Sequence, residues 1–230
     1  MYFQHSNDIW KDYPGLVPGV LLAQGITAQA FTAPRIARLQ SVTNVRLATA
    51  SEGELPEIQA WRRAFSSMGL KPTQYRCASE ALLRRFRKEG ALPQLHPLID
   101  ICNALSLAFA IPIAVFDIAR ISGFLEVGHA AGTETYLTFG GETQKPEVDE
   151  VIFADGAGRA HTRRWTNRQS AHSAVRAETC AVLIVAEALH VSAPQDMDNL
   201  VGAIAQELRL LWSITPKTAI LSRSSPRFEF

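Results

Sequence analysis

The sequence predicts an α+β fold, and three observations support this prediction. Segments with apolar residues at helical spacing lie mainly in the first half of the chain. Short segments rich in β-branched and aromatic residues follow between residues 124 and 165, and a continuous apolar run at 180–188 has the length of a buried strand. A doubly wound sheet would instead alternate strands and helices along the chain.

The 230-residue chain is 47% hydrophobic and 20% charged, which is typical of a globular protein with a full core. Its net charge of +1 excludes a global field that would draw it onto nucleic acid or an anionic membrane. The three cysteines, Cys77, Cys102 and Cys180, lack the paired spacing of a disulfide framework or a zinc knuckle. The longest apolar run, residues 105–116, is shorter than the ~20 residues of a membrane span, so we expect a soluble, cytoplasmic protein.

Turn residues and apolar spacing mark the first elements. Residues 16–26 are expected to form a strand, and residues 41–49 fit either a second strand or the start of a helix. Apolar residues recur at helical spacing over 57–68. Ser79 is the predicted N-cap of a further helix, which Gly90 ends.

Residues 96–117 are expected to form a buried helix that Pro112 stops, followed by a buried strand. Asp100, Asn103 and Ser106 interrupt the apolar surface at a spacing that places them along one side of the helix. A buried Asp or Asn without a hydrogen-bond partner costs roughly 1–3 kcal/mol. These side chains therefore either cap neighbouring loops or line a pocket, and the residues alone favour neither alternative.

The second half of the chain predicts hairpins or a meander, then a buried strand and a last helix. Glycines separate four short β-type segments, at 124–129, 135–139, 150–154 and 159–165. The buried strand is expected at 180–188 and the helix at 196–212. The end of the chain, from Pro216, is expected to be loosely held.

The chain contains no nucleophile motif, phosphate-binding loop or zinc-protease motif, and we expect neither a metal nor another cofactor. Two polar stretches remain, residues 71–79 and 161–170, and a basic helix face follows the first. Each stretch fits a solvated loop, but arginine beside aromatic residues is also typical of phosphate contacts and base stacking. The arginines concerned are Arg76, Arg84, Arg85, Arg87, Arg163, Arg164 and Arg168.

The segment LIDICNAL at 98–105, with PIAVFD at 112–117, resembles the B3/4 domain, the editing module of the bacterial phenylalanyl-tRNA synthetase beta chain. The segment EVIFAD at 150–155 resembles a later segment of the same domain. The resemblance covers residues 58–190 and is greatest to freestanding B3/4 proteins, which have no synthetase attached. It implies mixed and antiparallel sheets with packed helices.

The resemblance also implies how the chain is divided and what its pocket does. We expect a single domain with an N-terminal strand and helix extension, a B3/4 core, a C-terminal helix and a flexible tail, at 1–55, 56–190, 191–213 and 214–230. In the synthetase, this module receives the aminoacylated 3′ end of tRNA and hydrolyses the wrong amino acid, chiefly tyrosine, from it.

The resemblance extends to individual pocket positions. Asp100, Asn103 and Pro112 match the family, and Cys102 stands where the family has a pocket Thr. Ala114 replaces the family's pocket His. The Glu that contacts the tyrosine hydroxyl aligns with Val185, or with Glu187 after a shift. Recognition of tyrosine therefore does not carry over from the family to this chain, and the residues do not say which amino acid is accepted.

The leading hypothesis is a trans-editing aminoacyl-tRNA deacylase whose partners are the aminoacylated 3′ end of tRNA and its amino acid. The predicted catalytic residues are Asn103, His161, Arg164, Asn167 and Gln169. The predicted substrate contacts are Asp100, Cys102, Ala114, Tyr75, Arg76, Ser79, Trp165, Arg168, Ser170 and Glu187. The predicted RNA contacts are Arg84, Arg85, Arg87, Lys88 and Arg163.

Two alternatives remain open. One is a non-catalytic module that binds an amino acid, a metabolite or an RNA end, and the other is a domain with a vestigial pocket that mediates protein contacts. Convergence of Glu187, Arg164 and Asn103 on one cavity would support a ligand site. An Arg164 side chain directed into bulk solvent would instead favour a plain surface loop.

Overall fold

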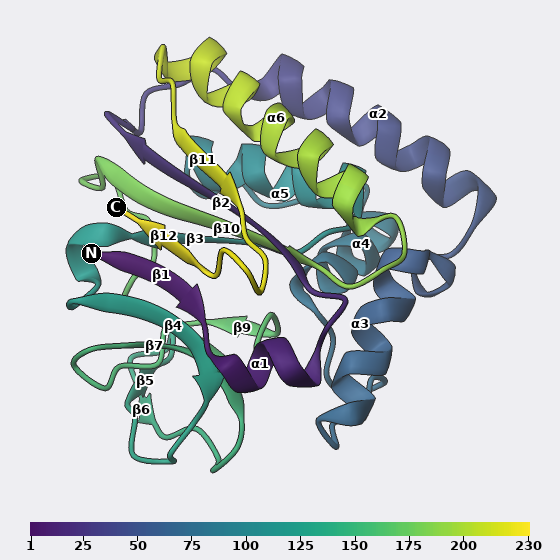
Figure 1. Ribbon diagram of the computed structural model, residues 1–230. Helices are drawn as coiled ribbons and strands as arrows, with labels where there is room; N and C mark the ends of the chain where they lie inside the picture. Colours follow the sequence, from purple (N-terminus) through teal and green to yellow (C-terminus); the bar gives the residue numbers. More distant parts are fainter.

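Two four-stranded β-sheets pack against each other in the computed structural model, which describes residues 1–230 (Figure 1). The first sheet has the order β12 (Arg227–Glu229), β1 (Tyr2–His5), β4 (Phe124–His129), β7 (Val151–Asp155). The second has the order β11 (Lys217–Ile220), β2 (Val17–Gln24), β10 (Ala181–Ala188), β3 (Ile113–Asp117). All neighbours are antiparallel except β1 and β4. The predicted α+β fold with mixed and antiparallel sheets is confirmed.

Helices cover the outer face of the second sheet (Figure 1). These are α2 (Ala33–Thr49), α5 (Pro97–Phe109) and α6 (Ala193–Trp212). The other elements are α1 (Asn7–Asp12), α3 (Pro56–Ser67), α4 (Ala78–Glu89), two short 3₁₀ turns (Glu52–Glu54, Ile118–Arg120), and the hairpins β5–β6 (Tyr136–Leu137, Thr143–Gln144) and β8–β9 (Thr162–Arg163, Arg168–Gln169). None of these helices combines the length and apolar character needed to span a membrane.

Alternation along β10 divides its side chains between two apolar cores. Ile184 and Ala186 belong to the core beneath α2, α5 and α6. Leu183 and Val185 belong to the core between the two sheets, because successive strand residues point to opposite faces. Glu187 lies on the same face of β10 as Leu183 and Val185, so its carboxylate is directed toward the first sheet and not toward the helices.

Most elements predicted from periodicity form near their expected bounds. The strand at 16–26 is β2, the helix at 57–68 is α3, and 180–188 contains β10. The alternative left open at 41–49 resolves as part of the helix α2. Gly90 ends α4 with a φ of 75°, a backbone conformation that glycine adopts without steric cost.

Two expectations, one about the start of a helix and one about the C-terminal tail, were wrong. Cys77, not Ser79, is the N-cap of α4, and Ser79 is fully buried in the first turn. The tail is not loosely held, because β11 pairs with β2 and β12 pairs with β1. Burial of Phe228 anchors β12, and the two C-terminal strands satisfy edges that the N-terminal strands would otherwise expose.

Candidate functional site

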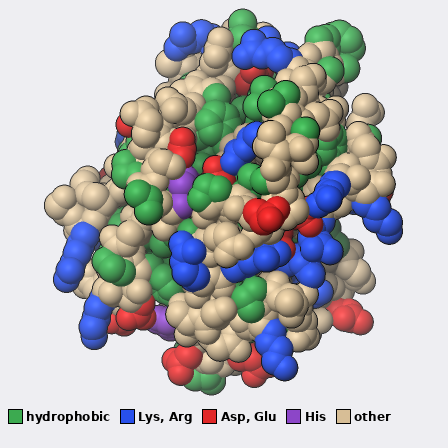
Figure 2. Space-filling view, turned by 90° about the vertical axis from the view of Figure 1, so that its right-hand side faces the viewer, with side chains coloured by type: hydrophobic (Ala, Val, Ile, Leu, Met, Phe, Trp, Pro, Cys, Tyr) green, Lys and Arg blue, Asp and Glu red, His purple; other side chains and the backbone are tan.

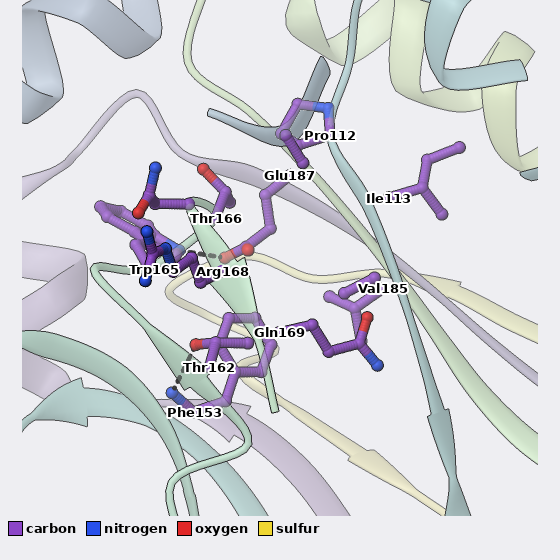
Figure 3. Close-up of a pocket in the computed structure, with 13 residues that line it drawn as sticks. Pro112, Ile113, Phe153, Thr162, Trp165, Thr166, Arg168, Gln169, Val185 and Glu187 are labelled. Atoms are coloured by element: carbon purple, nitrogen blue, oxygen red, sulfur yellow. Dashed lines mark hydrogen bonds between the residues drawn. The ribbon is translucent and has the colours of Figure 1, made fainter. Parts of the chain in front are cut away.

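A pocket lies where β3 and β10 face the β8–β9 hairpin (Figure 3). We call it the Glu187 pocket, and it contains about 390 Å³ of space that atoms do not fill. Its lining residues include Ala114, Phe153, Trp165, Gln169, Val185 and Glu187. Apolar walls with a few convergent polar groups are typical of small-molecule sites.

Glu187 supplies the charged group of this pocket. Only 2% of the residue is exposed, and its Oε1 accepts two hydrogen bonds. One comes from Trp165 Nε1 at 2.8 Å (Figure 3), and the other comes from His5 Nε2 at 2.7 Å. Oε2 accepts no hydrogen bond from the protein, so it remains available to a donor group within the pocket.

The turn between β8 and β9 holds the Trp165 indole in place. Arg164 and Trp165 have φ values of 50° and 56°, a left-handed conformation that costs roughly 1–2 kcal/mol per non-glycine residue. Glu150 offsets this cost by accepting the Arg164 N–H at 2.7 Å and a bidentate pair from Arg163 at 2.6 and 2.7 Å. The indole of Trp165 also packs edge-on against Trp61, with ring centroids 5.0 Å apart.

Electrostatics reinforce this turn. Burial opposes ionisation of Glu150, but the hydrogen bonds from Arg163 and from the Arg164 N–H outweigh it and lower the pKa of the carboxyl. Glu150 is therefore an anion that fixes the hairpin beside the pocket. Backbone strain maintained by such partners is common at functional sites.

Polar groups from the hairpin stand at the pocket rim. Asn167 Nδ2 donates to the Arg76 carbonyl at 2.7 Å, and Gln169 Nε2 donates to the Val115 carbonyl at 2.6 Å. These bonds fix both amides and leave their side-chain oxygens without a protein partner. Arg168 is exposed and makes no hydrogen bond or ion pair, so its guanidinium is free for an anion.

Six residues of the predicted site line the Glu187 pocket: Ala114, Trp165, Asn167, Arg168, Gln169 and Glu187. The strand register explains part of this grouping. Ala114 on β3 lies opposite Val185 on β10, and Glu187 is two positions further along the same face. Both positions considered for the family's Glu therefore line one pocket, and only Glu187 carries a carboxylate there.

Asn103, Arg164 and Glu187 do not converge on one cavity. Asn103 lines a separate groove that also contains Gln169. The Arg164 guanidinium lies 4.6 Å from the centre of the Tyr75 ring, in a surface hollow outside the pocket. The expected direct contact of Asn103 and Arg164 with the same ligand as Glu187 is therefore not supported by their placement.

Several predicted substrate contacts make structural bonds instead, which corrects those assignments. Asp100 Oδ1 accepts the Leu95 N–H at 2.9 Å and thus caps the loop before α5, and burial raises the pKa of this carboxyl. Cys102 is buried in the core beneath the helices, where burial raises its pKa to about 12. Ser170 Oγ donates to the Leu137 carbonyl, and the buried Ser79 Oγ contacts Cys77 Sγ.

The predicted RNA-binding arginines are largely paired with carboxylates. Arg163 is buried and bound to Glu150, so its assignment as an RNA contact was wrong. Arg84 and Arg87 both pair with Glu52. Arg85 pairs with Glu89, and Arg76, which was predicted as a substrate contact, pairs with Glu80. Figure 2 shows this face of the molecule, where basic side chains are interspersed with acidic ones.

His161 is closed off from both the pocket and solvent. Its Nδ1 lies 2.8 Å from Ser173 Oγ and its Nε2 lies 3.3 Å from Asp155 Oδ2. Asp155 Oδ2 also accepts the Ser122 N–H, and its Oδ1 accepts the Arg159 N–H, both at 3.0 Å. The predicted catalytic role of His161 was wrong, because the side chain is fully buried and serves this loop-closing network.

Asp155→Asn should destabilise the protein at neutral pH. Burial opposes ionisation of Asp155, but its hydrogen bonds lower the pKa from 3.8 to about 2. A lowered folded-state pKa adds stability above the unfolded-state value, and that stability is lost as pH falls toward the folded value. The charge contributes roughly 1–2 kcal/mol after solvent screening, so the gap between wild type and variant should narrow from pH 6 to pH 3.

Urea unfolding at a series of pH values measures this gap. Asp198→Asn is the matched control, because Asp198 is exposed and makes no ion pair. A gap that stays constant between pH 6 and pH 3 would contradict the assignment of this stability to the Asp155 charge.

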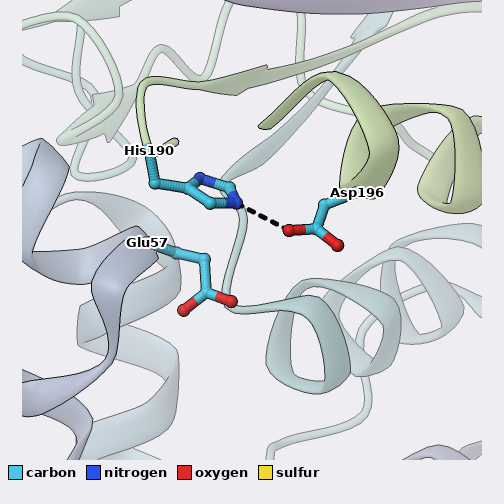
Figure 4. A group of neighbouring side chains, drawn as sticks. All are labelled: Glu57, His190 and Asp196. Carbon is cyan, nitrogen blue, oxygen red and sulfur yellow. Dashed lines mark hydrogen bonds and ion pairs between the residues drawn. The ribbon is translucent and has the colours of Figure 1, made fainter. Parts of the chain in front are cut away.

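Glu57, His190 and Asp196 form a second polar cluster, with ligand-type atoms within 4.8 Å of one another (Figure 4). Protein partners already engage these groups. His190 Nε2 lies 2.8 Å from Asp196 Oδ2, and Arg46 Nη2 lies 2.7 Å from Glu57 Oε1. The adjacent guanidinium opposes a cation here, so we interpret the cluster as an Arg46–Glu57 ion pair between α2 and α3 that lies beside a His190–Asp196 contact at the start of α6.

The model of the B3/4 domain family matches residues 60–197. The chain belongs to the B3/4 domain family. The matched range contains every residue named above for the Glu187 pocket, whereas His5, which holds the Glu187 carboxylate, lies outside it.

Relatives of this B3/4 protein are phenylalanine–tRNA ligase beta subunits. A 76-residue segment is 34% identical to that of Cereibacter sphaeroides, and it covers 33% of this chain and 9% of the relative. A 77-residue segment is 32% identical to the beta subunit of Thiobacillus denitrificans, and it covers 34% of this chain and 10% of that relative. The match thus spans about a tenth of these relatives. A Pyrococcus horikoshii phenylalanyl-tRNA synthetase beta-subunit fragment superposes with a TM-score of 0.48 and 10% identity, over 95% of this chain and 53% of that chain.

Two residues at the Glu187 pocket were not predicted as site residues from the sequence. His5 reaches Glu187 from β1, which lies 182 residues earlier in the chain, and no local pattern could reveal that contact. Phe153 forms an apolar wall from β7. The continuous apolar run Val151–Phe153 within the predicted segment at 150–154 was the available signal for Phe153, because such a run predicts a strand that is buried on both faces.

Proposed function

We propose that this B3/4 protein is an aminoacyl-tRNA deacylase that acts on mischarged tRNA in trans. The reaction would add water to the ester carbonyl and break its bond to the terminal ribose oxygen, releasing a free amino acid and uncharged tRNA. Similarity to tRNA ligase subunits supports an association with tRNA. The proposal implies action in the cytoplasm, where tRNA is charged and used.

The observation that carries the proposal is the buried Glu187 carboxylate with one oxygen free toward the pocket. Such an oxygen binds an ammonium or hydroxyl donor of the aminoacyl group, and the low local dielectric strengthens that bond. The free Arg168 guanidinium at the rim suits a phosphate of the 3′ end.

Positioning accounts for the chemistry in this proposal. An aminoacyl ester is already activated, so a site that orients water and ribose can accelerate hydrolysis without its own nucleophile. The fixed amides of Asn167 and Gln169 present oxygen acceptors for that water. Ala114 leaves space where the family has a His side chain, so the accepted amino acid would be selected mainly by Glu187 and by apolar contacts.

A panel of tRNAs, each charged with a different radiolabelled amino acid, tests the function. We expect the protein to release at least one amino acid well above the spontaneous rate of hydrolysis. Release at only the spontaneous rate from every charged tRNA of the panel would reject the proposal that the protein is a deacylase.

The competing function is a binding module without turnover. Ala114 favours it, because this position lacks the polar side chain of the family. Equilibrium dialysis with free amino acids distinguishes the two functions. Saturable binding together with no release of any amino acid from tRNA would support the binding module.

A further inference from the structure

A second cavity, which we call the Asp100 groove, lies between α2, α5 and the loop segment 91–94 that precedes α5. It contains about 700 Å³ of space that atoms do not fill, and this volume is typical of small-molecule sites. Ala104 and Leu107, both buried, give the groove apolar walls. None of its lining residues belongs to the Glu187 pocket, so the two cavities are separate.

We infer that the Asp100 groove binds a small primary amine, a molecule with an ammonium group on an aliphatic body. This site goes beyond the proposed function and differs from the aminoacyl contact predicted for Asp100. Three features support the inference: a carboxylate that no cationic side chain balances, two free amides beside it, and an apolar wall that extends away from it.

Asp100 is the only charged residue that lines the groove. Its Oδ1 accepts the Leu95 N–H, whereas Oδ2 accepts no hydrogen bond and no Lys or Arg pairs with the carboxylate. Burial raises the pKa of this carboxyl, because the anion is poorly solvated there. Burial also lowers the pKa of the neighbouring His96, which favours the neutral ring. A ligand cation would therefore stabilise a charge that the protein itself does not balance.

Two side-chain amides extend the polar end of the groove. Asn103 lies about one turn after Asp100 on the same side of α5, and Gln40 lines the groove from α2. Neither amide makes a hydrogen bond within the protein. With Asp100 Oδ2, their oxygens offer three acceptors, and a primary ammonium has three N–H donors. A hydroxyl group has one donor and a quaternary ammonium has none, so the primary amine is the best match.

The apolar wall follows α5 away from the carboxylate. Leu107 lies two helical turns after Asp100, about 10 Å along the helix axis. Ala104 lies between them, and its small side chain leaves space along the groove. An aliphatic body placed along this wall would be removed from water, which favours binding. The groove thus fits a molecule with a charge at one end only.

Isothermal titration calorimetry with hexylammonium chloride and its neutral analogue hexanol tests the inference. We expect the wild type to bind hexylammonium saturably and more tightly than hexanol. Asp100→Asn should weaken hexylammonium binding about 5- to 10-fold, a loss between those of exposed and fully buried ion pairs, and leave hexanol binding unchanged. Asparagine retains an oxygen for the Leu95 N–H, so the loop should be preserved. Asp198→Asn is the matched control, because Asp198 is exposed and makes no ion pair.

Ala37→Leu tests the cavity without changing its charge. Ala37 is exposed on α2 and lines the groove, so the larger side chain would fill part of the groove and leave the core intact. This variant should lower the affinity for both hexylammonium and hexanol. Ala48→Leu should change neither affinity, because Ala48 is exposed on the same helix but lies outside the groove.

Glu187→Gln separates this site from the proposed deacylase site, whose carboxylate could also attract an amine. Hexylammonium binding that depends on Asp100 and not on Glu187 would support the groove even if no tRNA were deacylated. Loss of binding in Glu187→Gln alone, equal binding by wild type and Asp100→Asn, or no binding by the wild type would overturn the inference even if deacylation were observed. Tighter binding of N-acetyl-lysine amide than of hexylammonium would assign the groove to a lysine of a partner protein and would also overturn it.

Discussion

Glu187→Gln is expected to lower kcat/KM for deacylation about 10- to 150-fold with little change in stability. Glutamine has the same shape, so its Oε1 can still accept from Trp165 and His5. The amide nitrogen, however, replaces the free carboxylate oxygen, and a donor then faces the donor group of the ligand. A hydrogen bond to a charged group contributes about 1.5–3 kcal/mol, which corresponds to the expected change in kcat/KM.

Steady-state rates on the mischarged tRNA identified by the panel measure this effect, together with thermal unfolding. Glu142→Gln is the control, because Glu142 is exposed and its side chain makes no hydrogen bond or ion pair. The melting temperature of Glu187→Gln should remain within a few degrees of wild type, since 1 kcal/mol corresponds to about 2–4 °C at this chain length. Unchanged kcat/KM would mean that Glu187 serves only as the acceptor for Trp165 and His5.

Secondary structure was predictable where local spacing determines it. The helix α3 and the strand β10 carry their patterns within a few turns or residues, so periodicity located both. The strands β11 and β12 were missed because each depends on an edge provided by the N-terminal part of the chain. Their pairing is a tertiary effect that short segments of sequence do not reveal.

The pocket was predictable in part. The dense stretch at 161–170 supplies Trp165, Asn167, Arg168 and Gln169 to the pocket, as predicted from its composition. The separation of Arg163 from these residues could not be predicted, because it depends on Glu150 lying beside the hairpin in the fold. The sequence alone does not show which arginine of this stretch is buried against a carboxylate and which is exposed.

The central helix shows a different limit. Its polar stripe was correctly identified, but the three side chains have separate fates. Asp100 caps a loop, Ser106 donates to the Ile111 carbonyl at 2.6 Å, and Asn103 borders two surface grooves, one of which also contains Gln169. Periodicity assigns residues to one side of a helix, whereas the loops packed around the helix determine which of them can reach a ligand.

Trp165→Ala is expected to destabilise the protein by about 3–5 kcal/mol, the usual cost of removing a large buried aromatic side chain. The indole is fully buried and packs edge-on against Trp61 and Tyr13. Its removal would also leave the strained left-handed turn without its main anchor. The melting temperature should fall by about 6–20 °C, measured by circular dichroism or calorimetry.

Trp165→Phe separates packing from positioning. Phenylalanine retains much of the buried ring but removes Nε1, so Glu187 loses one of its two donors. Trp61→Phe is the matched control: Trp61 is 1% exposed in the same core, and its Nε1 has no hydrogen-bond partner to lose. If Trp165 positions the carboxylate, Trp165→Phe should lower kcat/KM about 10-fold more than Trp61→Phe, because a charge-assisted hydrogen bond is lost in only one of them. Equal activity of the two variants would restrict Trp165 to a packing role and leave His5 as the group that orients Glu187.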